Sequence, residues 1–421
     1  MQIEILDNYK ITVLPSGVKI ISEYIPHFKS FSLGFWINVG SRDENSRNNG
    51  ITHFIEHMIF KGTKNRTAKQ ISDAIESYGG YLNAFTSKEE TCVYVRGLES
   101  NFNLYFDVLS DLIQNPLFKD LHIKKEAGVV IDELRDIEDN PEELIFDKFE
   151  EKIFAGNSLS YPIIGTEKNI LSFNSTLLHQ FHKKFYRADN LLVVSSGCIE
   201  HEKIVELAQK SLSIKSGNSN QKRKTFVKNF AEDFFVEKDT NQIHTIIGKT
   251  SFGFNDERRT ILKILTTLLG EGSSSRLFQA VREKLGITYQ INSFLNSYKD
   301  VSAFGVYYST SEKHWEKVYS IINREFKNII DGKLKDKEIK RVKEYLKGNT
   351  ILSLENTTNR MIRLANSILH YGKVLTLEET IKKIDSVTKD EIIQIANEVL
   401  SQKDLITITL GSKNKSINKA A

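Results

Sequence analysis

Alternation of hydrophobic and polar positions predicts a β-strand early in this chain. Apolar side chains recur at every second position from 31 to 39, as Phe31, Leu33, Phe35, Ile37 and Val39, and the residues between them include Ser32, Gly34 and Asn38. This period of two is typical of a strand with one face in the core. We expect further strands at 92–95, 191–194, 243–247, 303–308 and 405–410.

Helical patterns lie between these strands. Thr67 and Gln70 have the spacing of a capping box, so we expect them to open a helix. That helix should end at Gly79-Gly80, because glycine accepts a left-handed backbone without strain. Other helices are expected over 122–139 and from Arg258, His314 and Lys337 onwards. Strands and helices therefore interleave in both halves, which indicates mixed α and β structure.

A polar segment divides the chain. Residues 213–230 contain Ser-Gly-Asn-Ser-Asn followed by Gln-Lys-Arg-Lys, without strand or helix periodicity. A chain of 421 residues is too long for a single core. We therefore expect an N-terminal domain over 1–212, an interdomain linker over 213–230, and a C-terminal domain of similar fold over 231–421.

A faint internal repeat supports two related domains. Asn83-Ala84-Phe85 followed by Tyr94 in the first half parallels Asn292-Ser293-Phe294 followed by Tyr307 in the second. Each segment comes shortly after a predicted helix and before a predicted strand. If the halves are duplicates, only the first of them carries the pair of histidines considered below.

Composition and charge exclude several classes of protein. The net charge of +4 is the difference between 58 basic and 54 acidic side chains, so it does not predict a nucleic-acid partner. The basic run Lys222-Arg223-Lys224 lies in the presumed linker without aromatic residues, which is typical of a solvated segment. Cys92 and Cys198 are far apart and are interpreted as small buried residues, which fits a reducing compartment.

The chain also lacks signals for membranes and export. No stretch approaches the roughly 20 apolar residues that a membrane-spanning helix needs, so no membrane insertion is expected. The first residues have neither the basic start nor the apolar core of a secretory signal. We expect a cytoplasmic protein, or one of the mitochondrial matrix if a transit peptide has been removed.

Two histidines on an apolar helix point to a metal. Residues 50–60 are apolar nearly all round, which favours a helix inside a domain. His53 and His57 are four apart and therefore project from one face, with Glu56 beside them. A buried carboxylate next to two imidazoles is costly without a compensating partner, and a divalent cation supplies one. The alternative, two satisfied core histidines, is disfavoured by the glutamates around them.

The third ligand comes from downstream residues. A catalytic zinc ion usually takes three protein ligands and a water. The helix expected over 122–139 carries Glu126 and Glu133, seven residues and almost two full turns apart, so either of them could approach the metal. Its core side is expected to consist of Val129, Val130, Leu134 and Ile137. Glu56 is not required as a ligand, and it would take a proton from a zinc-bound water and deliver it to the leaving amine.

The motif His53-Phe54-Ile55-Glu56-His57 resembles that of the inverzincin metallopeptidases of the pitrilysin and insulysin family. The flanking segments 57–63 and 83–87 are similar as well, and the chain resembles in particular the two-domain branch that includes the β subunit of mitochondrial processing peptidase. The resemblance implies an α+β fold with two homologous αβ domains. Each would have a mostly antiparallel sheet covered by helices, and the linker would join them into a clamshell.

The resemblance also assigns roles to residues. Glu133 would be the third ligand of one Zn²⁺ per chain, and Glu126 a carboxylate of the outer shell that orients the site. Asn83, Ala84 and Phe85 would form an exposed edge strand to which a substrate backbone adds. Arg282 and Tyr289 would hold the substrate and meet the charge that develops on the scissile carbonyl oxygen.

Two functions are compatible with this sequence. The first is a zinc metalloendopeptidase that cuts unfolded peptides or presequence-like segments in a chamber between two domains. The second is a catalytically silent structural or assembly subunit of the same fold. The chain lacks the glycine-rich loop of the family's non-catalytic subunits, because the segment 269–275 is too short and too charged. As a peptidase it is expected to act as a homodimer or as a monomeric clamshell.

Overall fold

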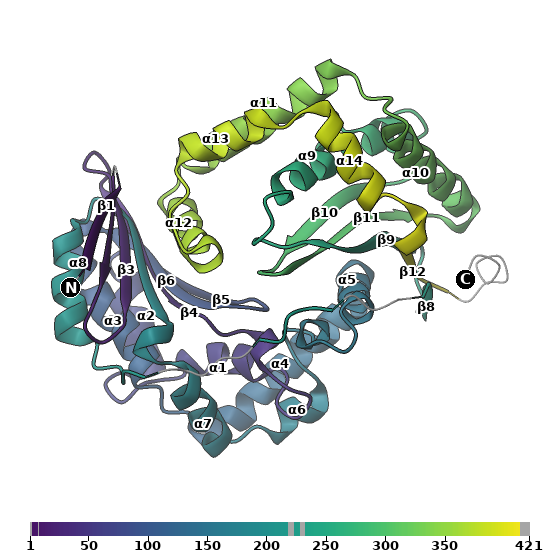
Figure 1. Cartoon of the computed structure of the whole chain (residues 1–421). Helices are drawn as coiled ribbons and strands as arrows, with labels where there is room; N and C mark the ends of the chain where they lie inside the picture. The colour runs from purple at the N-terminus through teal and green to yellow at the C-terminus, as the bar shows by residue number, and fades with distance from the viewer. Residues whose placement is uncertain (1, 7, 218–222, 228–231, 413–421) are drawn as a thin grey trace. The chain divides into compact units, whose positions relative to one another are not determined.

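The chain folds into two compact units, each built on one β-sheet (Figure 1). The structure is a computed structural model that describes residues 2–6, 8–217, 223–227 and 232–412. The first unit comprises Met1–Arg135, Tyr161–Lys224 and Ser353–Val374, and the second comprises Asp136–Ser160, Thr225–Leu352 and Leu375–Ala421. The expected fold class, with two αβ domains and mostly antiparallel sheets, is confirmed.

The sheet of the first unit has seven strands in the order β1-β2-β3-β7-β4-β6-β5. All neighbouring strands are antiparallel except β3 and β7. The strands are β1 Gln2–Leu6, β2 Tyr9–Val13, β3 Lys19–Tyr24, β4 Ser30–Ile37, β5 Tyr81–Thr86, β6 Thr91–Leu98 and β7 Leu191–Gly197. This order leaves β5, the strand of Asn83 to Phe85, at one edge of the sheet.

Helices surround this sheet. They are α1 Ile51–Ile59, α2 Ala68–Glu76, α3 Phe102–Gln114, α4 Asp120–Asp139, α6 Glu167–Ser172, α7 Ser175–Phe185, α8 His201–Ser211 and α12 Thr357–Tyr371. The capping box of α2 is confirmed, because the Gln70 backbone N–H donates to Thr67 and the Gln70 side chain accepts from the Thr67 N–H. Helix α4 continues past Arg135 and so runs from the first unit into the second.

Strand β4 is buried on both faces, which corrects the expectation of one core face. Phe31 and Phe35 pack edge-on against aromatic rings of α3. On the opposite face Trp36 packs with Met361 and other residues of α12, and the Ser32 hydroxyl bonds to the Thr357 hydroxyl at 2.9 Å. Figure 1 shows α12 beside this sheet. The second face is buried because a helix from residues more than 300 positions away covers it.

The second unit has a five-stranded sheet in the order β10-β11-β9-β12-β8. Its strands are β8 Phe234–Glu237, β9 Ile243–Phe252, β10 Gln290–Ser297, β11 Val301–Thr310 and β12 Ile406–Gly411. Its helices are α5 Pro141–Ile153, α9 Arg259–Gly270, a π-helix Phe278–Glu283, α10 Trp315–Ile330, α11 Asp336–Ser353, α13 Leu377–Ser386 and α14 Lys389–Val399. The helices expected here begin within two residues of the predicted positions.

The two sheets share one topology. The order β5-β6-β4-β7-β3 corresponds to β10-β11-β9-β12-β8, and the last pair of each series is the parallel one. Asn83 lies opposite Tyr94 in the first sheet, and Asn292 lies opposite Tyr307 in the second. The repeat expected from the sequence is therefore a repeat of structure.

Each unit also receives a helix from the opposite half of the chain. Helix α12 lies between β11 and β12 in sequence, yet it packs on β3, β4 and β7 of the first unit. Helix α5 lies between β6 and β7 in sequence, yet it packs on β9 and β12 of the second unit. The spatial units therefore differ from the ranges 1–212 and 231–421 in these two segments.

The expected linker, 213–230, lies partly outside the described residues, since 218–222 and 228–231 are not described. Residues 213–217 and 223–224 of this segment belong to the first unit, and residues 225–227 belong to the second. Arg223 donates to both carboxylate oxygens of Asp43 at 2.9 and 2.8 Å, and the Lys224 carbonyl accepts from Arg42 at 3.1 Å. The interpretation of this basic run as solvated is therefore wrong for Arg223, whose side chain is 15% exposed.

Both cysteines, Cys92 and Cys198, are free and buried, as the sequence predicted. Within the described ranges, no helix combines the length and the apolar character that crossing a membrane requires.

Candidate metal centre

Helix α1 begins at a glycine that no other residue could replace without strain. Gly50 has a φ of 96°, and a Cβ atom there would lie 2.6 Å from the Ile164 carbonyl oxygen. Because glycine has no capping side chain, the buried carboxylate of Glu44 accepts the N–H groups of Gly50 and Thr52 at 2.7 and 2.8 Å. This carboxylate compensates the positive end of the helix and fixes where α1 starts.

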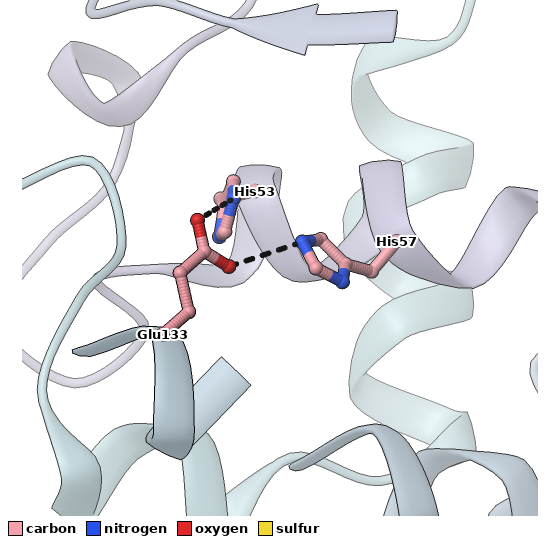
Figure 2. A group of neighbouring side chains, drawn as sticks. All are labelled: His53, His57 and Glu133. Atoms are coloured by element: carbon pink, nitrogen blue, oxygen red, sulfur yellow. Dashed lines mark ion pairs between the residues drawn. The ribbon is translucent and has the colours of Figure 1, made fainter. Parts of the chain in front are cut away.

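His53 and His57 project from one face of α1 toward Glu133 of α4, as Figure 2 shows. One Glu133 oxygen lies 3.7 Å from His53 Nε2 and the other lies 3.4 Å from His57 Nε2. One ligand atom from each of the three residues lies within 4.8 Å of the others. The structure therefore brings together the two histidines and Glu133, the glutamate that the resemblance implies as the third ligand.

The donor atoms of these three residues lie close enough together to hold one metal ion. Ligand atoms about 2.0–2.1 Å from a zinc ion in tetrahedral geometry lie about 3.3 Å from one another. The two nitrogen–oxygen distances, 3.7 and 3.4 Å, end on different oxygens of Glu133 and are slightly longer than this value. Two imidazoles and one carboxylate also form a known donor set for catalytic zinc, with a fourth position left for water.

Glu126 occupies a different position from Glu133. Its carboxylate is 3.0 Å from Nδ1 of His57, the ring nitrogen that faces away from Glu133, and 2.7 Å from the Lys61 ammonium group. Burial alone would raise the pKa of Glu126, but its contacts with His57 and Lys61 outweigh burial and hold that pKa below its usual value. Glu126 can therefore fix the orientation and tautomer of the His57 ring.

The pKa values of the two histidines are shifted in opposite directions. Burial lowers the pKa of His57, but hydrogen bonds and charges of Glu126 and Glu133 outweigh burial and raise that pKa to about 9. Burial, followed by the neighbouring His57, lowers the pKa of His53 to about 4. A metal ion that binds both rings must displace the proton of His57, so binding releases protons.

Glu56 lies on the same helix but contacts a strand. The Thr86 hydroxyl at the end of β5 donates to Glu56 Oε2 at 2.5 Å. Burial raises the pKa of Glu56, and the bond from Thr86 opposes that rise in part. The Tyr186 hydroxyl is buried without a hydrogen-bond partner among the described residues, and burial, then the charge of Glu56, raises its pKa.

The remaining predicted site residues lie outside helices α1 and α4. Asn83, Ala84 and Phe85 are in β5, and among the described residues this edge strand pairs with β6 alone. Arg282 is in the π-helix of the second unit, with its guanidinium 5.0 Å from the centre of the Phe278 ring. Tyr289 of the second unit is 76% exposed. Their proposed roles stay predictions.

Sequence reasoning missed two contacts and one buried hydroxyl, that of Tyr186. Thr86 lies within the segment 83–87 that carried the resemblance, but nothing in the sequence linked its hydroxyl to Glu56. Lys61 lies in the segment 57–63, which also carries the resemblance, and it bonds to Glu126. No sequence signal singled out Tyr186. Each contact joins residues distant in sequence, so a local pattern could not reveal it.

Comparison with known proteins places the chain in a family. A relative in Streptomyces coelicolor, named an uncharacterized zinc protease, is 33% identical over 97% of this chain and 91% of its own length. The chain belongs to peptidase family M16. The family model described as Insulinase (Peptidase family M16) matches residues 19–167, and the one described as Peptidase M16 inactive domain matches residues 172–346.

Other M16 relatives agree with this assignment. The protein named uncharacterized zinc protease YmxG of Bacillus subtilis is 33% identical over 95% of this chain and 97% of its own length. The fold matches the crystal structure of a protease from Helicobacter pylori, with a TM-score of 0.88, 21% identity and coverage of 96% and 100% of the two chains. A Pseudomonas fluorescens structure titled peptidase M16 inactive domain gives a TM-score of 0.90 at 18% identity and covers 97% of this chain and 99% of its own chain.

His53, Glu56, His57 and Glu133 all lie within residues 19–167, the part of the chain that the Insulinase (Peptidase family M16) model matches.

Proposed function

We propose that this M16 protein is a zinc metalloendopeptidase that hydrolyses unfolded peptides or presequence-like segments. The observation that carries the proposal is the convergence of His53, His57 and Glu133, which offer one ligand atom each within 4.8 Å of the others. The names of the relatives, which call them zinc proteases, support the choice of metal and reaction.

In this proposal each residue of the group has a role. His53, His57 and Glu133 would hold one zinc ion, and Glu126 would orient His57. When bound, the ion supplies a Lewis acid for the scissile carbonyl and lowers the pKa of water to about 7. Glu56 accepts a proton from the attacking water and passes it to the leaving amine. The side chains of His53 and His57 are 12% and 21% exposed and that of Glu133 is 42% exposed, so solvent reaches the site from the side of Glu133.

Substrate would bind by adding a strand to β5. Among the described residues one edge of β5 pairs with no other strand, and the N–H of Ala84 there donates to the Asn83 side chain at 2.9 Å, a bond that a substrate strand would replace. Main-chain pairing gives affinity with loose demands on side chains, and it requires an extended, unfolded segment. The chamber between two domains and the donation of hydrogen bonds by Arg282 and Tyr289 belong to this proposal as predictions.

The test combines metal analysis with cleavage of a mixed peptide pool. The protein purified without chelator should contain about one zinc ion per chain, since the site offers one set of ligands. Glu56→Gln should retain the zinc and lose cleavage by about 100-fold or more, because general base catalysis contributes on the order of 10²–10⁴. Sequencing of the fragments would define the cleavage preference.

Two outcomes would contradict the proposal. Unchanged cleavage by Glu56→Gln would remove Glu56 as the base. Absence of stoichiometric zinc together with no cleavage of any unfolded peptide would favour the alternative, a catalytically silent subunit of the same fold.

A further inference from the structure

The contact between Glu56 and Thr86 joins the proposed base to the strand proposed to bind substrate. Glu56 is on α1, and Thr86 is the last residue of β5. The Thr86 hydroxyl donates to Oε2 of Glu56 at 2.5 Å. A short hydrogen bond to a carboxylate is stronger than one between neutral groups, so it restricts rotation of the carboxylate.

Thr86 itself is held firmly by the turn that follows it. The Ser87 N–H donates to the Glu90 carbonyl at 2.7 Å, and the Ser87 hydroxyl accepts the N–H groups of Glu89 and Glu90 at 3.2 and 3.0 Å. Across the hairpin, Thr86 pairs with Thr91 of β6, which is buried. The end of β5 therefore has little freedom to move.

Two buried charges in the same turn attach it to the rest of the first unit. The Lys88 ammonium group donates to the Tyr161 carbonyl at 2.8 Å. The Glu89 carboxylate accepts from Arg42 at 2.6 Å. Lys88 and Glu89 are 5% and 4% exposed, so both bonds are shielded from water. The turn that fixes Thr86 is thus anchored at two further points.

We propose that Thr86 is a positioning residue for Glu56. Its hydroxyl holds the Glu56 carboxylate through Oε2, so that the remaining oxygen is presented in one orientation for proton transfer. Because Thr86 ends the same strand whose free edge faces the substrate, the position of the peptide and the position of the base are set by one rigid element. This inference rests on the proposed function, in which Glu56 is the base.

The experiment compares Thr86→Val, which has the same shape without a hydroxyl, with Thr86→Ser, which keeps the hydroxyl. Thr86→Val should lower kcat about 10-fold to 100-fold with KM and zinc content unchanged, since only part of the general-base contribution depends on orientation. Thr86→Ser should stay within about threefold of the wild-type kcat, because the donor remains. Thr86→Ala serves as a second variant if Thr86→Val does not fold.

A control removes a buried threonine hydroxyl elsewhere. Thr266 in α9 is fully buried and bonds to the Leu262 carbonyl at 2.8 Å. Thr266→Val should leave kcat unchanged and should show how much stability the loss of such a hydroxyl costs by itself.

A second readout does not depend on activity. Crystal structures of the wild type and the variants should show the Glu56 carboxylate in place in Thr86→Ser and displaced in Thr86→Val. A Glu56 carboxylate that keeps its place in Thr86→Val, or a Thr86→Ser variant as slow as Thr86→Val, would overturn the inference. If the wild type cleaves no peptide, the proposed function fails, and the position of Glu56 in these structures still decides the role of Thr86.

Discussion

At the residue scale, the two carboxylates of α4 differ in what they contact. The oxygens of Glu133 lie 3.7 and 3.4 Å from the Nε2 atoms of His53 and His57. Glu126 instead contacts Nδ1 of His57 and the ammonium group of Lys61. A residue that binds the metal directly contributes more to metal affinity than a residue that only orients a ligand. Loss of an orienting residue typically lowers metal affinity by about 10–100-fold.

We therefore predict that Glu133→Gln lowers zinc affinity well beyond about 100-fold, and that Glu126→Gln lowers it by about 10–100-fold. Competition with a chromophoric chelator would measure both affinities. Glu138→Gln is a matched control, because Glu138 lies on the same helix with its side chain exposed. Equal losses for the two variants would contradict the assignment of Glu133 as ligand.

The histidine pair could be read from the sequence, because a spacing of four places two side chains on one face of a helix. The choice between Glu126 and Glu133 could not, since both lie on one side of α4 and both reach the histidines. The expected core side of α4 was also partly wrong. Val130 is fully buried, but Val129 is 47% exposed, since adjacent residues of a helix point about 100° apart.

At the scale of elements, helix α12 is held on the first sheet by a charged pair as well as by apolar contacts. Arg360 of α12 donates to Glu23 of β3, which is 5% exposed and also accepts from the Ser196 hydroxyl at 2.8 Å. Removal of one partner leaves a buried charge without compensation, which is strongly destabilising.

We predict that Arg360→Ala lowers the free energy of unfolding by about 2–4 kcal/mol, somewhat below the usual cost because Arg360 is a quarter exposed. Urea denaturation followed by circular dichroism would measure the change. Lys373→Ala, at an exposed residue just after α12, should change stability by less than about 0.5 kcal/mol. If both variants unfold at the same urea concentration, the pair contributes nothing.

Most strands and helices could be predicted, since periodicity and caps are local properties of the sequence. The capping box of α2 and the alternation along β4 are examples. What covers each face of a strand is not local. Ser32, Gly34 and Asn38 suggested a solvent face, but α12 covers the Ser32 side, where Ser32 is paired by threonine hydroxyls and Gly34 makes room for Trp36.

At the scale of the whole molecule, the units are not continuous stretches of sequence. The face of the first sheet that carries Ile21, Trp36 and Val194 is covered by α12, which belongs to the second half of the chain. A fragment that ends in the linker would therefore expose a large apolar surface to water.

We predict that residues 1–230 expressed alone are insoluble or molten, and that co-expression with 231–421 yields a soluble complex of the two fragments. Solubility, near-ultraviolet circular dichroism and co-purification through a tag on one fragment would test this. A point variant that leaves each interface intact, Lys373→Ala in the second fragment, is the control. A soluble, monomeric fragment 1–230 with native-like near-ultraviolet signal would show that α12 is dispensable.

The reciprocal donation of α5 and α12 bears on how such a chain could have originated. Both helices follow the fourth strand of their repeat, β6 in one case and β11 in the other, and both leave their own half to complete the opposite sheet. Two identical copies of a half-length ancestor could exchange these helices symmetrically, as in a domain-swapped dimer. Fusion of the duplicated genes would then preserve the contacts of both exchanged helices and join the former subunits in one chain. One copy would also be free to lose its histidines.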